Sequence, residues 1–144
     1  MTNSPSNPIF AYEFTVPAGA LDRNGHVNNV NFVQWMQDAA VRHFDFIGGI
    51  PPMQAAGATW VVRSHTIEYL RPAFAGDRLE VRTWVANLRR VRSLRCYRFV
   101  RLSDGKLLVK GETDWVFVDA ATGAPRLIPG EVARIFPLLP EGEE

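Results

Sequence analysis

The chain has a single cysteine, Cys96, so no disulfide can form within it, which fits a reducing compartment. No stretch approaches the roughly 18 consecutive apolar residues of a membrane span. The first eight residues are polar and contain Pro5 and Pro8, and they lack the apolar centre of a secretory signal. We therefore expect a cytoplasmic protein without a membrane partner.

The chain also lacks an excess of charge of either sign, because its formal net charge is only +1. A near-neutral chain offers no general case for nucleic-acid binding, so we expect no nucleic-acid partner. The three histidines, His26, His43 and His65, do not have the spacing of a metal site. We expect no metal and no cofactor.

Neither an internal repeat nor a linker interrupts the 144 residues, a length that suits one domain with its own core. The periodic pattern runs from residue 9 to residue 136. We predict a single domain over 9–136, a flexible N-terminal tail over 1–8 and a C-terminal tail over 137–144.

Apolar periodicity predicts one long helix and five strands. Alternation predicts a first strand over residues 9–16, and steps of three and four predict a helix from Val30 to about Ile47. Gly48 and Gly49 end this helix, and Pro51 and Pro52 are expected to prevent its resumption. Four further strands are predicted over 59–70, 79–88, 93–102 and 107–118, with a short helix over 129–136. This order predicts an α+β fold in which one long antiparallel sheet curls around one central helix.

The segment from Leu21 to Asn29 shows neither the apolar period of a helix nor that of a strand. It places polar groups against the start of the long helix. Asn28 or Asn29 can cap that helix. The first backbone N–H groups of a helix have no partner within it, and the helix dipole makes this end electropositive. A carboxylate, Asp22, and an imidazole, His26, beside such an oxyanion site form an arrangement suited to acyl chemistry.

This loop, Asp22-Arg-Asn-Gly25-His-Val-Asn-Asn29, and the aromatic helix start that follows it resemble the hotdog-fold thioesterases related to 4-hydroxybenzoyl-CoA thioesterase. The Asn-x-His-Val-Asn-Asn segment is also similar to plant acyl-carrier-protein thioesterases. The resemblance covers about residues 9–136. It implies a hotdog fold and hydrolysis of acyl- or aryl-CoA, or acyl-carrier-protein, thioesters, with coenzyme A entering only as part of the substrate.

Carried over residue by residue, the resemblance implies that Asp22 is the catalytic carboxylate, acting as nucleophile or as general base. The backbone N–H of Asn29, joined by that of Val30, would polarise the thioester oxygen. His26 would order the loop, assist water or bind substrate; the alternative is a hydrogen bond within the loop only. Gly25 would let the loop pass close to the acyl group, and Asn28 would lie beside the substrate or serve only as a cap.

Four arginines gather at the turn between the third and fourth strands, in the run 89–95. Arginine binds phosphate bidentately, and the matching hairpin of the resembled family contacts the nucleotide of coenzyme A. We therefore expect substrate binding at Arg89, Arg90, Arg92 and Ser93. An acidic carrier protein would be attracted by the same charges, and the alternative is a solvated hairpin that protects a sheet edge. Arg126 is a weaker candidate.

The resemblance also implies a homodimer or a dimer of dimers, with sites between subunits. Thr59, at the start of the second strand, would then reach the partner's Asp22 loop and bind substrate. Two other functions stay open. A non-catalytic acyl-CoA sensor uses the same fold, as does a hydratase, although Gly25 occupies the place where a hydratase loop carries proline.

Other polar and aromatic residues have structural interpretations. We expect His43 to be packed or at an interface, and His65 to be a cross-strand partner. Cys96 is expected to be structural. The indoles predicted to lie in the sheet core are Trp60, Trp84 and Trp115. Glu68, beside Arg71, is expected to form an ion pair and is a reserve carboxylate.

Overall fold

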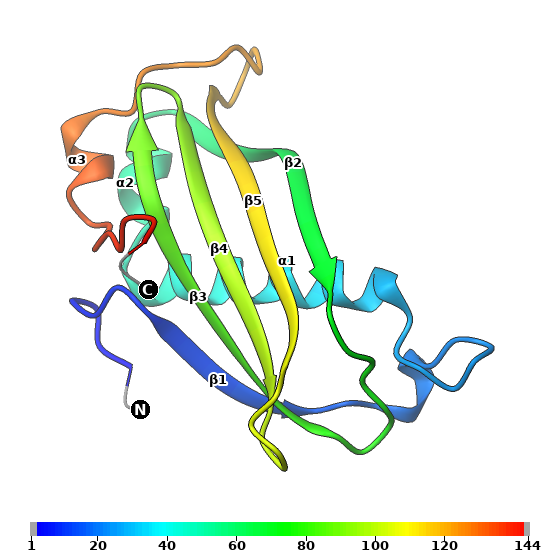
Figure 1. Ribbon diagram of the computed structural model, residues 1–144. Coiled ribbons are helices and arrows are strands. Elements are labelled where there is room, and N and C mark those ends of the chain that lie inside the picture. The colour runs from blue at the N-terminus through cyan, green and yellow to red at the C-terminus, as the bar shows by residue number, and fades with distance from the viewer. Residues whose placement is uncertain (1–2, 143–144) are drawn as a thin grey trace.

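The computed structural model describes residues 3–142 (Figure 1). The strands are β1 (Phe10–Thr15), β2 (Ala58–Tyr69), β3 (Arg78–Arg89), β4 (Arg92–Arg101) and β5 (Leu107–Asp119). The helices are η1 (Ala18–Ala20), a 3₁₀ turn, and α1 (Asn29–Phe46), α2 (Ile50–Ala55) and α3 (Gly130–Ala133). The predicted long helix and the last four strands are confirmed, with every end within one residue of its predicted position.

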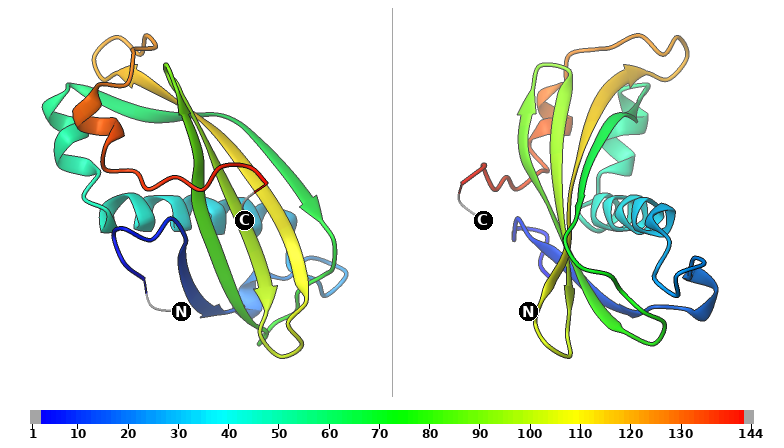
Figure 2. Two further views of the ribbon diagram at one scale, coloured as in Figure 1. Left: turned by 60° about the vertical axis from the view of Figure 1, so that its left-hand side comes forward. Right: turned by 45° about the vertical axis from the view of Figure 1, so that its right-hand side comes forward.

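All five strands form one sheet in the order β1-β3-β4-β5-β2, and every neighbouring pair is antiparallel. The sheet is curved, and α1 lies across one of its faces (Figure 2). The predicted α+β architecture of a single antiparallel sheet with one long helix is therefore confirmed. The two edges of the sheet are β1, a strand of 6 residues, and β2, a strand of 12 residues.

Packing of α1 against the sheet makes the main core. The helix buries Phe32, Met36, Ala39 and Ala40 among sheet residues that include Phe99. Two alanines in succession and the facing Gly111 let the helix approach closely, because a Cβ at Gly111 would stand 2.9 Å from Met36 Sδ. The apolar stripe that predicted the helix is therefore also the surface that fixes its position.

A second short helix, α2, follows α1 directly, so the prediction that Pro51 and Pro52 prevent resumption of the helix was wrong. Both prolines lie in the first turn of α2, after the cap residue Gly49. In that turn the N–H that proline lacks would have had no partner anyway, and the fixed φ of proline suits a helix. The prolines therefore start a new helix in a new direction.

Both ends of the described chain make contacts beyond the predicted bounds of 9 and 136. Asn3 exchanges two hydrogen bonds with the backbone of Ala11, at 2.7 and 2.9 Å. Leu139 N donates to Val85 O at 2.9 Å, so the segment after α3 follows β3. The described part of the tails is therefore attached to the domain; residues 1–2 and 143–144 lie outside the described residues.

No helix within residues 3–142 is long and apolar enough to cross a membrane.

Candidate active site

The loop before α1 is closed on itself by Asp22. The backbone N–H of Asp22 donates to His26 O at 2.7 Å, and Asp22 Oδ1 accepts from the N–H groups of Asn24 (2.8 Å) and His26 (3.2 Å). Gly25 supplies the turn with a φ of +76°, which glycine adopts without strain. The second carboxylate oxygen of Asp22 makes no hydrogen bond within residues 3–142, and the side chain is exposed. The loop thus holds the carboxylate by one oxygen and leaves the other available.

The start of α1 leaves one donor unused. Asn28 is the cap: its Oδ1 accepts from Val30 N at 3.0 Å, and its backbone oxygen accepts from Asn31 N at 2.9 Å. The N–H of Val30, one of the two predicted oxyanion donors, is therefore already occupied, and this part of the prediction was wrong. In the described chain the N–H of Asn29 donates to no acceptor, so it is the donor that the helix end presents.

Asp22, His26 and Asn29 line one cavity of about 340 Å³ together with Phe32 and Tyr69. Tyr69 Oη donates to Asn29 O at 3.3 Å, which ties β2 to the start of α1. The structure therefore brings together the three residues predicted to be catalytic. Gly25, Asn28 and Val30 are exposed in the same segment.

His26 lies edge-on against Phe74, with ring centroids 5.3 Å apart. The reserve carboxylate Glu68 does not pair with Arg71 as predicted, because Arg71 Nη1 donates to Leu107 O at 2.7 Å instead. In the part of the chain that the structure describes, no cluster of three or more His, Cys, Asp or Glu side chains is placed to hold a metal ion.

The arginine hairpin divides between the two faces of the sheet. Arg89, Arg90 and Arg92 are exposed and line a shallow outer depression with Asp114. Arg92 pairs with Asp114, whereas Arg89 and Arg90 form no ion pair within residues 3–142. Arg90 occupies the turn with a φ of 55°.

Ser93 lies on the opposite, helix-facing side and is buried, and its hydroxyl donates to Asn87 O at 3.1 Å. It therefore does not join the exposed arginines. Arg126 donates to Ala56 O at 2.7 Å and lies 3.7 Å from Asp119, so its guanidinium is engaged in holding the turn after β5.

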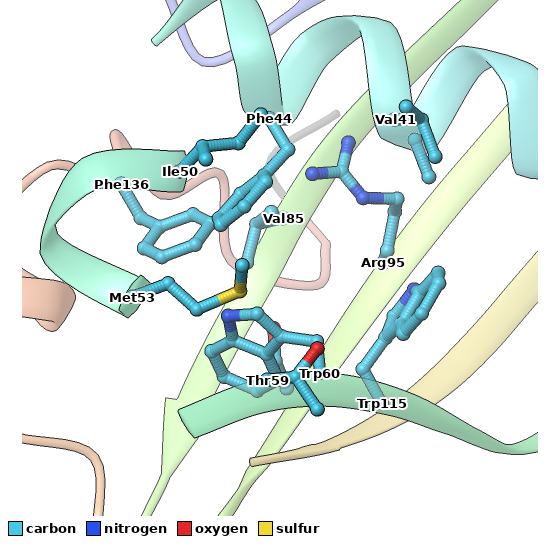
Figure 3. Close-up of a pocket in the computed structure, with 12 residues that line it drawn as sticks. Val41, Phe44, Ile50, Met53, Thr59, Trp60, Val85, Arg95, Trp115 and Phe136 are labelled. Carbon is cyan, nitrogen blue, oxygen red and sulfur yellow. The ribbon is translucent and has the colours of Figure 1, made fainter. Parts of the chain in front are cut away.

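A second cavity, which sequence reasoning missed, lies between α1, α2 and the sheet (Figure 3). Its volume is about 200 Å³, and we call it the aromatic pocket. The side chains that line it are Ala40, Val41, Phe44, Ile50, Met53, Thr59, Trp60, Val85, Ser93, Arg95, Trp115 and Phe136. Phe44 can lie at its wall because Gly49 has no side chain: a Cβ there would stand 2.2 Å from Phe44 Cε1.

Two of the three indoles predicted to be core line this pocket. Trp60 and Trp115 are only half-buried, and Trp60 Nε1 has no hydrogen-bond partner within residues 3–142. Trp84 is buried as predicted, on the outer face of the sheet with Cys96. His65 is the predicted cross-strand partner, with Nδ1 2.8 Å from Thr113 Oγ1.

Arg95 enters the aromatic pocket from β4 and contacts buried His43. Arg95 Nη1 lies 2.8 Å from His43 Nδ1 and donates to Thr83 Oγ1 at 3.1 Å. Arginine can only donate, so His43 Nδ1 accepts and the ring proton is on Nε2. Burial, reinforced by the charge of Arg95, lowers the pKa of His43 from 6.5 to about 3, and burial also lowers the pKa of Arg95. His43 is packed, as predicted, and neutral.

The two cavities are at different parts of α1. The cavity beside Asp22 contacts the start of the helix at Asn29 and Phe32, whereas the aromatic pocket contacts its second half at Ala40 and Phe44. Thr59 lines only the aromatic pocket. Within one chain, the structure therefore does not bring Thr59 to Asp22.

Comparison with known proteins agrees with this geometry. A model described as "Thioesterase-like superfamily" matches residues 16–136. The acyl-CoA thioester hydrolase YbgC of Escherichia coli is 29% identical over 129 residues, which are 90% of this chain and 92% of that protein. The chloroplastic acyl-[acyl-carrier-protein] hydrolase FATB2 of Cuphea viscosissima is 26% identical over 135 residues, and the match spans 88% of this chain but only 32% of that protein.

Among solved structures, a 1,4-dihydroxy-2-naphthoyl-CoA thioesterase from Synechocystis superposes with a TM-score of 0.78 at 20% identity, over 88% of this chain and 94% of that one. At this identity the likeness establishes the fold. The predicted hotdog fold is confirmed.

The low pKa of His43 predicts a stability that depends on pH. Between pH 6.5 and about 3 the unfolded chain binds a proton at this ring and the folded chain does not, so stability falls as the pH falls through this range. The slope contributed by one such group approaches about 1.4 kcal/mol per pH unit. In His43→Gln the amide oxygen can accept from Arg95 without titrating, so urea unfolding between pH 4.5 and 7 should show a shallower slope.

The matched control is His26→Gln, at an exposed loop residue, which should keep the wild-type slope. Equal slopes for wild type and His43→Gln would contradict a buried neutral imidazole.

Proposed function

Because the chain belongs to the thioesterase-like superfamily, we propose that it is a thioester hydrolase acting on acyl- or aryl-CoA or on acyl-carrier-protein thioesters. The observation that carries the proposal is the pairing of two unused groups in one cavity. One is the second carboxylate oxygen of Asp22, and the other is the backbone N–H of Asn29 at the start of α1. A thioester carbonyl between them would meet a base or nucleophile and an oxyanion donor together.

Two routes use the same groups. As general base, Asp22 takes a proton from water while the water oxygen bonds to the thioester carbon. As nucleophile, its free oxygen bonds to that carbon directly, and water then cleaves the resulting anhydride. In both routes the C–S bond breaks, the thiol leaves with a proton, and Asn29 N–H stabilises the oxyanion. The reaction needs no cofactor or metal.

The loop geometry orients the side chain of Asp22. Two backbone N–H groups donate to Oδ1, which fixes the plane of the carboxyl group. His26 is tied to the same oxygen through its backbone and stands against Phe74, so its ring is held at the cavity wall. We assign His26 to ordering the loop and contacting the substrate or its attacking water.

We assign the phosphates of coenzyme A, or acidic residues of a carrier protein, to the hairpin tip. Arg89 and Arg90 are exposed cations that pair with no carboxylate in the described part of the chain, which leaves their guanidinium groups available to phosphate. Arg92 contributes less, because Asp114 already neutralises it. The buried Ser93 is assigned to the aromatic pocket, which it lines, and not to the nucleotide.

A homodimer formed through β2 is part of the proposal, with a dimer of dimers as its larger form. β2 is a long unpaired edge, and it exposes Val61, Val62 and Tyr69, at 42%, 36% and 42%. Such an edge is a template for pairing with a second copy. In this arrangement Thr59 of one subunit would face the Asp22 loop of the other. A cytoplasmic location is also proposed, since a chain with one cysteine forms no internal disulfide and therefore suits a reducing compartment.

The mechanism predicts the effect of Asp22→Asn. Asparagine keeps an oxygen for the two loop N–H groups, so the fold should persist, but it is neither base nor nucleophile. We expect kcat to fall by roughly 10²–10⁴-fold for acyl-CoA and aryl-CoA substrates, measured by thiol release.

The matched control is Asp45→Asn at an exposed residue near the end of α1, which should leave kcat unchanged. Unchanged turnover in Asp22→Asn would remove this carboxylate from the chemistry. Tight thioester binding by the wild type without any turnover would favour the acyl-CoA sensor instead.

The hairpin predicts a defect confined to substrates that carry phosphates. The double variant Arg89→Gln, Arg90→Asn removes both free cations, and asparagine tolerates the positive φ at residue 90. We expect KM for a CoA thioester to rise about tenfold or more at low salt with little change in kcat.

The same acyl group on N-acetylcysteamine, which lacks the nucleotide, provides the internal control and should be hydrolysed equally by wild type and variant. An equal loss on both thiols would mean that these arginines act on the fold or the acyl site.

The dimer is tested by sedimentation equilibrium at the concentrations used for kinetics. We expect a particle of at least twice the chain mass, because β2 exposes apolar residues along an unpaired edge. A fully active monomer would contradict the proposed intersubunit site. Mixing Asp22→Asn with a chain blocked at Thr59 by Thr59→Trp should restore part of the activity, since each mixed dimer would retain one intact site.

A further inference from the structure

The aromatic pocket contains a buried positive charge that no carboxylate within residues 3–142 neutralises. Arg95 is 4% exposed, and it takes part in none of the ion pairs formed within residues 3–142. Burying a charge is costly unless it is paired, so buried arginines almost always have an anionic partner. His43, whose ring accepts a hydrogen bond from Arg95, is neutral and brings no negative charge.

The hydrogen bonds of Arg95 are unevenly distributed over its guanidinium. Its hydrogen bonds to His43 Nδ1 and Thr83 Oγ1 are both made by Nη1. Thr83 Oγ1 donates onward to Cys96 O at 2.9 Å, so this side of the guanidinium is anchored to the sheet. In the described chain Nε and Nη2 donate to no acceptor. These two nitrogens form the side of the guanidinium whose parallel N–H bonds match the two oxygens of a carboxylate.

The free side belongs to the pocket. Figure 3 shows the guanidinium of Arg95 projecting from β4 toward α1, between Phe44 and Val41. The rest of the lining is mainly apolar and aromatic, with Trp60 and Trp115 on the sheet side. A single fork of donors in an otherwise apolar wall is the pattern of a small-molecule site in which one polar group sets orientation.

The size of the pocket limits its occupant. Its volume is about 200 Å³. An apolar cavity of roughly 150 Å³ holds benzene, so a single ring or a chain of about six carbons fills this space. A long fatty acyl chain exceeds it.

We propose that the aromatic pocket binds the carboxylate of a short or single-ring acyl group, with Arg95 Nε and Nη2 donating to its two oxygens. This deepens the proposed function and rests on it in one respect: the carboxylate is the end of the acyl group remote from the thioester. Thr59 places the pocket next to the edge where the partner's Asp22 loop is proposed to lie. The substrate class is therefore a dicarboxylic or carboxyaryl thioester.

Binding of benzoate and of benzyl alcohol to the full-length protein tests the pocket without any turnover. The two probes share a ring and differ in charge. Calorimetry should show that the wild type binds benzoate about 10–100-fold more tightly than benzyl alcohol, the range given by hydrogen bonds to a charged group. Arg95→Met should abolish this preference, and Arg95→Lys should keep part of it.

The matched control is Arg98→Met, the same substitution on the same strand, where the guanidinium lies over Trp84 on the other face. It should leave benzoate affinity unchanged. Equal wild-type affinities for the two probes, or benzoate binding that survives Arg95→Met, would overturn the proposal. If Arg95→Met does not fold, the proposal is still tested by the relative affinities of the wild type and of Arg95→Lys for benzoate and benzyl alcohol.

Kinetics separate this inference from the proposed function. Adipoyl-CoA and hexanoyl-CoA differ only in the terminal carboxylate, and the wild type should favour adipoyl-CoA in kcat/KM by about tenfold or more. Hydrolysis of both thioesters at equal rates would support the proposed hydrolase function and contradict the proposed carboxylate site. Benzoate binding through Arg95 without hydrolysis of any thioester would support the carboxylate site and contradict the proposed hydrolase function.

Discussion

Burial of one face of α1 against the curved sheet is the constraint on which both cavities depend. Phe32 and Met36 are almost fully buried, and each such side chain contributes about 1.5–3 kcal/mol relative to exposure. Gly111 and the two alanines of the helix let it lie close enough for this contact. Because the helix is fixed along its length, its unpaired N–H at Asn29 and its wall at Phe44 are fixed as well.

The loop before α1 uses this rigidity. The side-chain oxygen of Asn28 accepts a hydrogen bond from Val30 N, and one carboxylate oxygen of Asp22 accepts from the loop backbone. Each interaction removes one group from the possible chemistry and orients the next one along the chain. What is left is one carboxylate oxygen and one N–H, on two residues that line the same cavity beside the start of α1. Donors oriented before the reaction are what electrostatic stabilisation of an oxyanion requires.

The elements and the polar loop before α1 could be predicted from the sequence because their signals are local. Steps of three and four give the helix, alternation gives the strands, and the polar run at 21–29 stands out between them. Which of Asn28 and Asn29 caps the helix was left open by the residues, and the outcome decides which N–H is free. The prediction from Pro51 and Pro52 was wrong because proline, which is excluded from the interior of a helix, is well suited to its first turn.

The aromatic pocket was not predicted because it is assembled from segments far apart in the chain, including Phe44, Trp60 and Phe136. A local signal for Arg95 did exist: in an alternating strand it shares a face with Tyr97 and Phe99, which are buried. Because Arg95 was grouped with the exposed arginines of the hairpin, its position on the buried face of the strand was not predicted. Strand period places this charge on the core side, and the structure shows that the residues opposite it on β3 and β5, Val85 and Thr113, are not acidic.

The buried charge also bears on the proposed site between two subunits. Arg95 and Asp22 line different cavities of one subunit, so a single substrate bound to both must be bracketed by two copies or must extend along the helix. The exposed apolar edge of β2 favours the first arrangement, since it leads directly from Thr59 at the pocket to a surface that a second copy can pair with. In that geometry Asp22 of the other copy would act at the thioester end of a short acyl group, while Arg95 would neutralise the carboxylate at the remote end. The distance between those two groups would then select the length of the substrate.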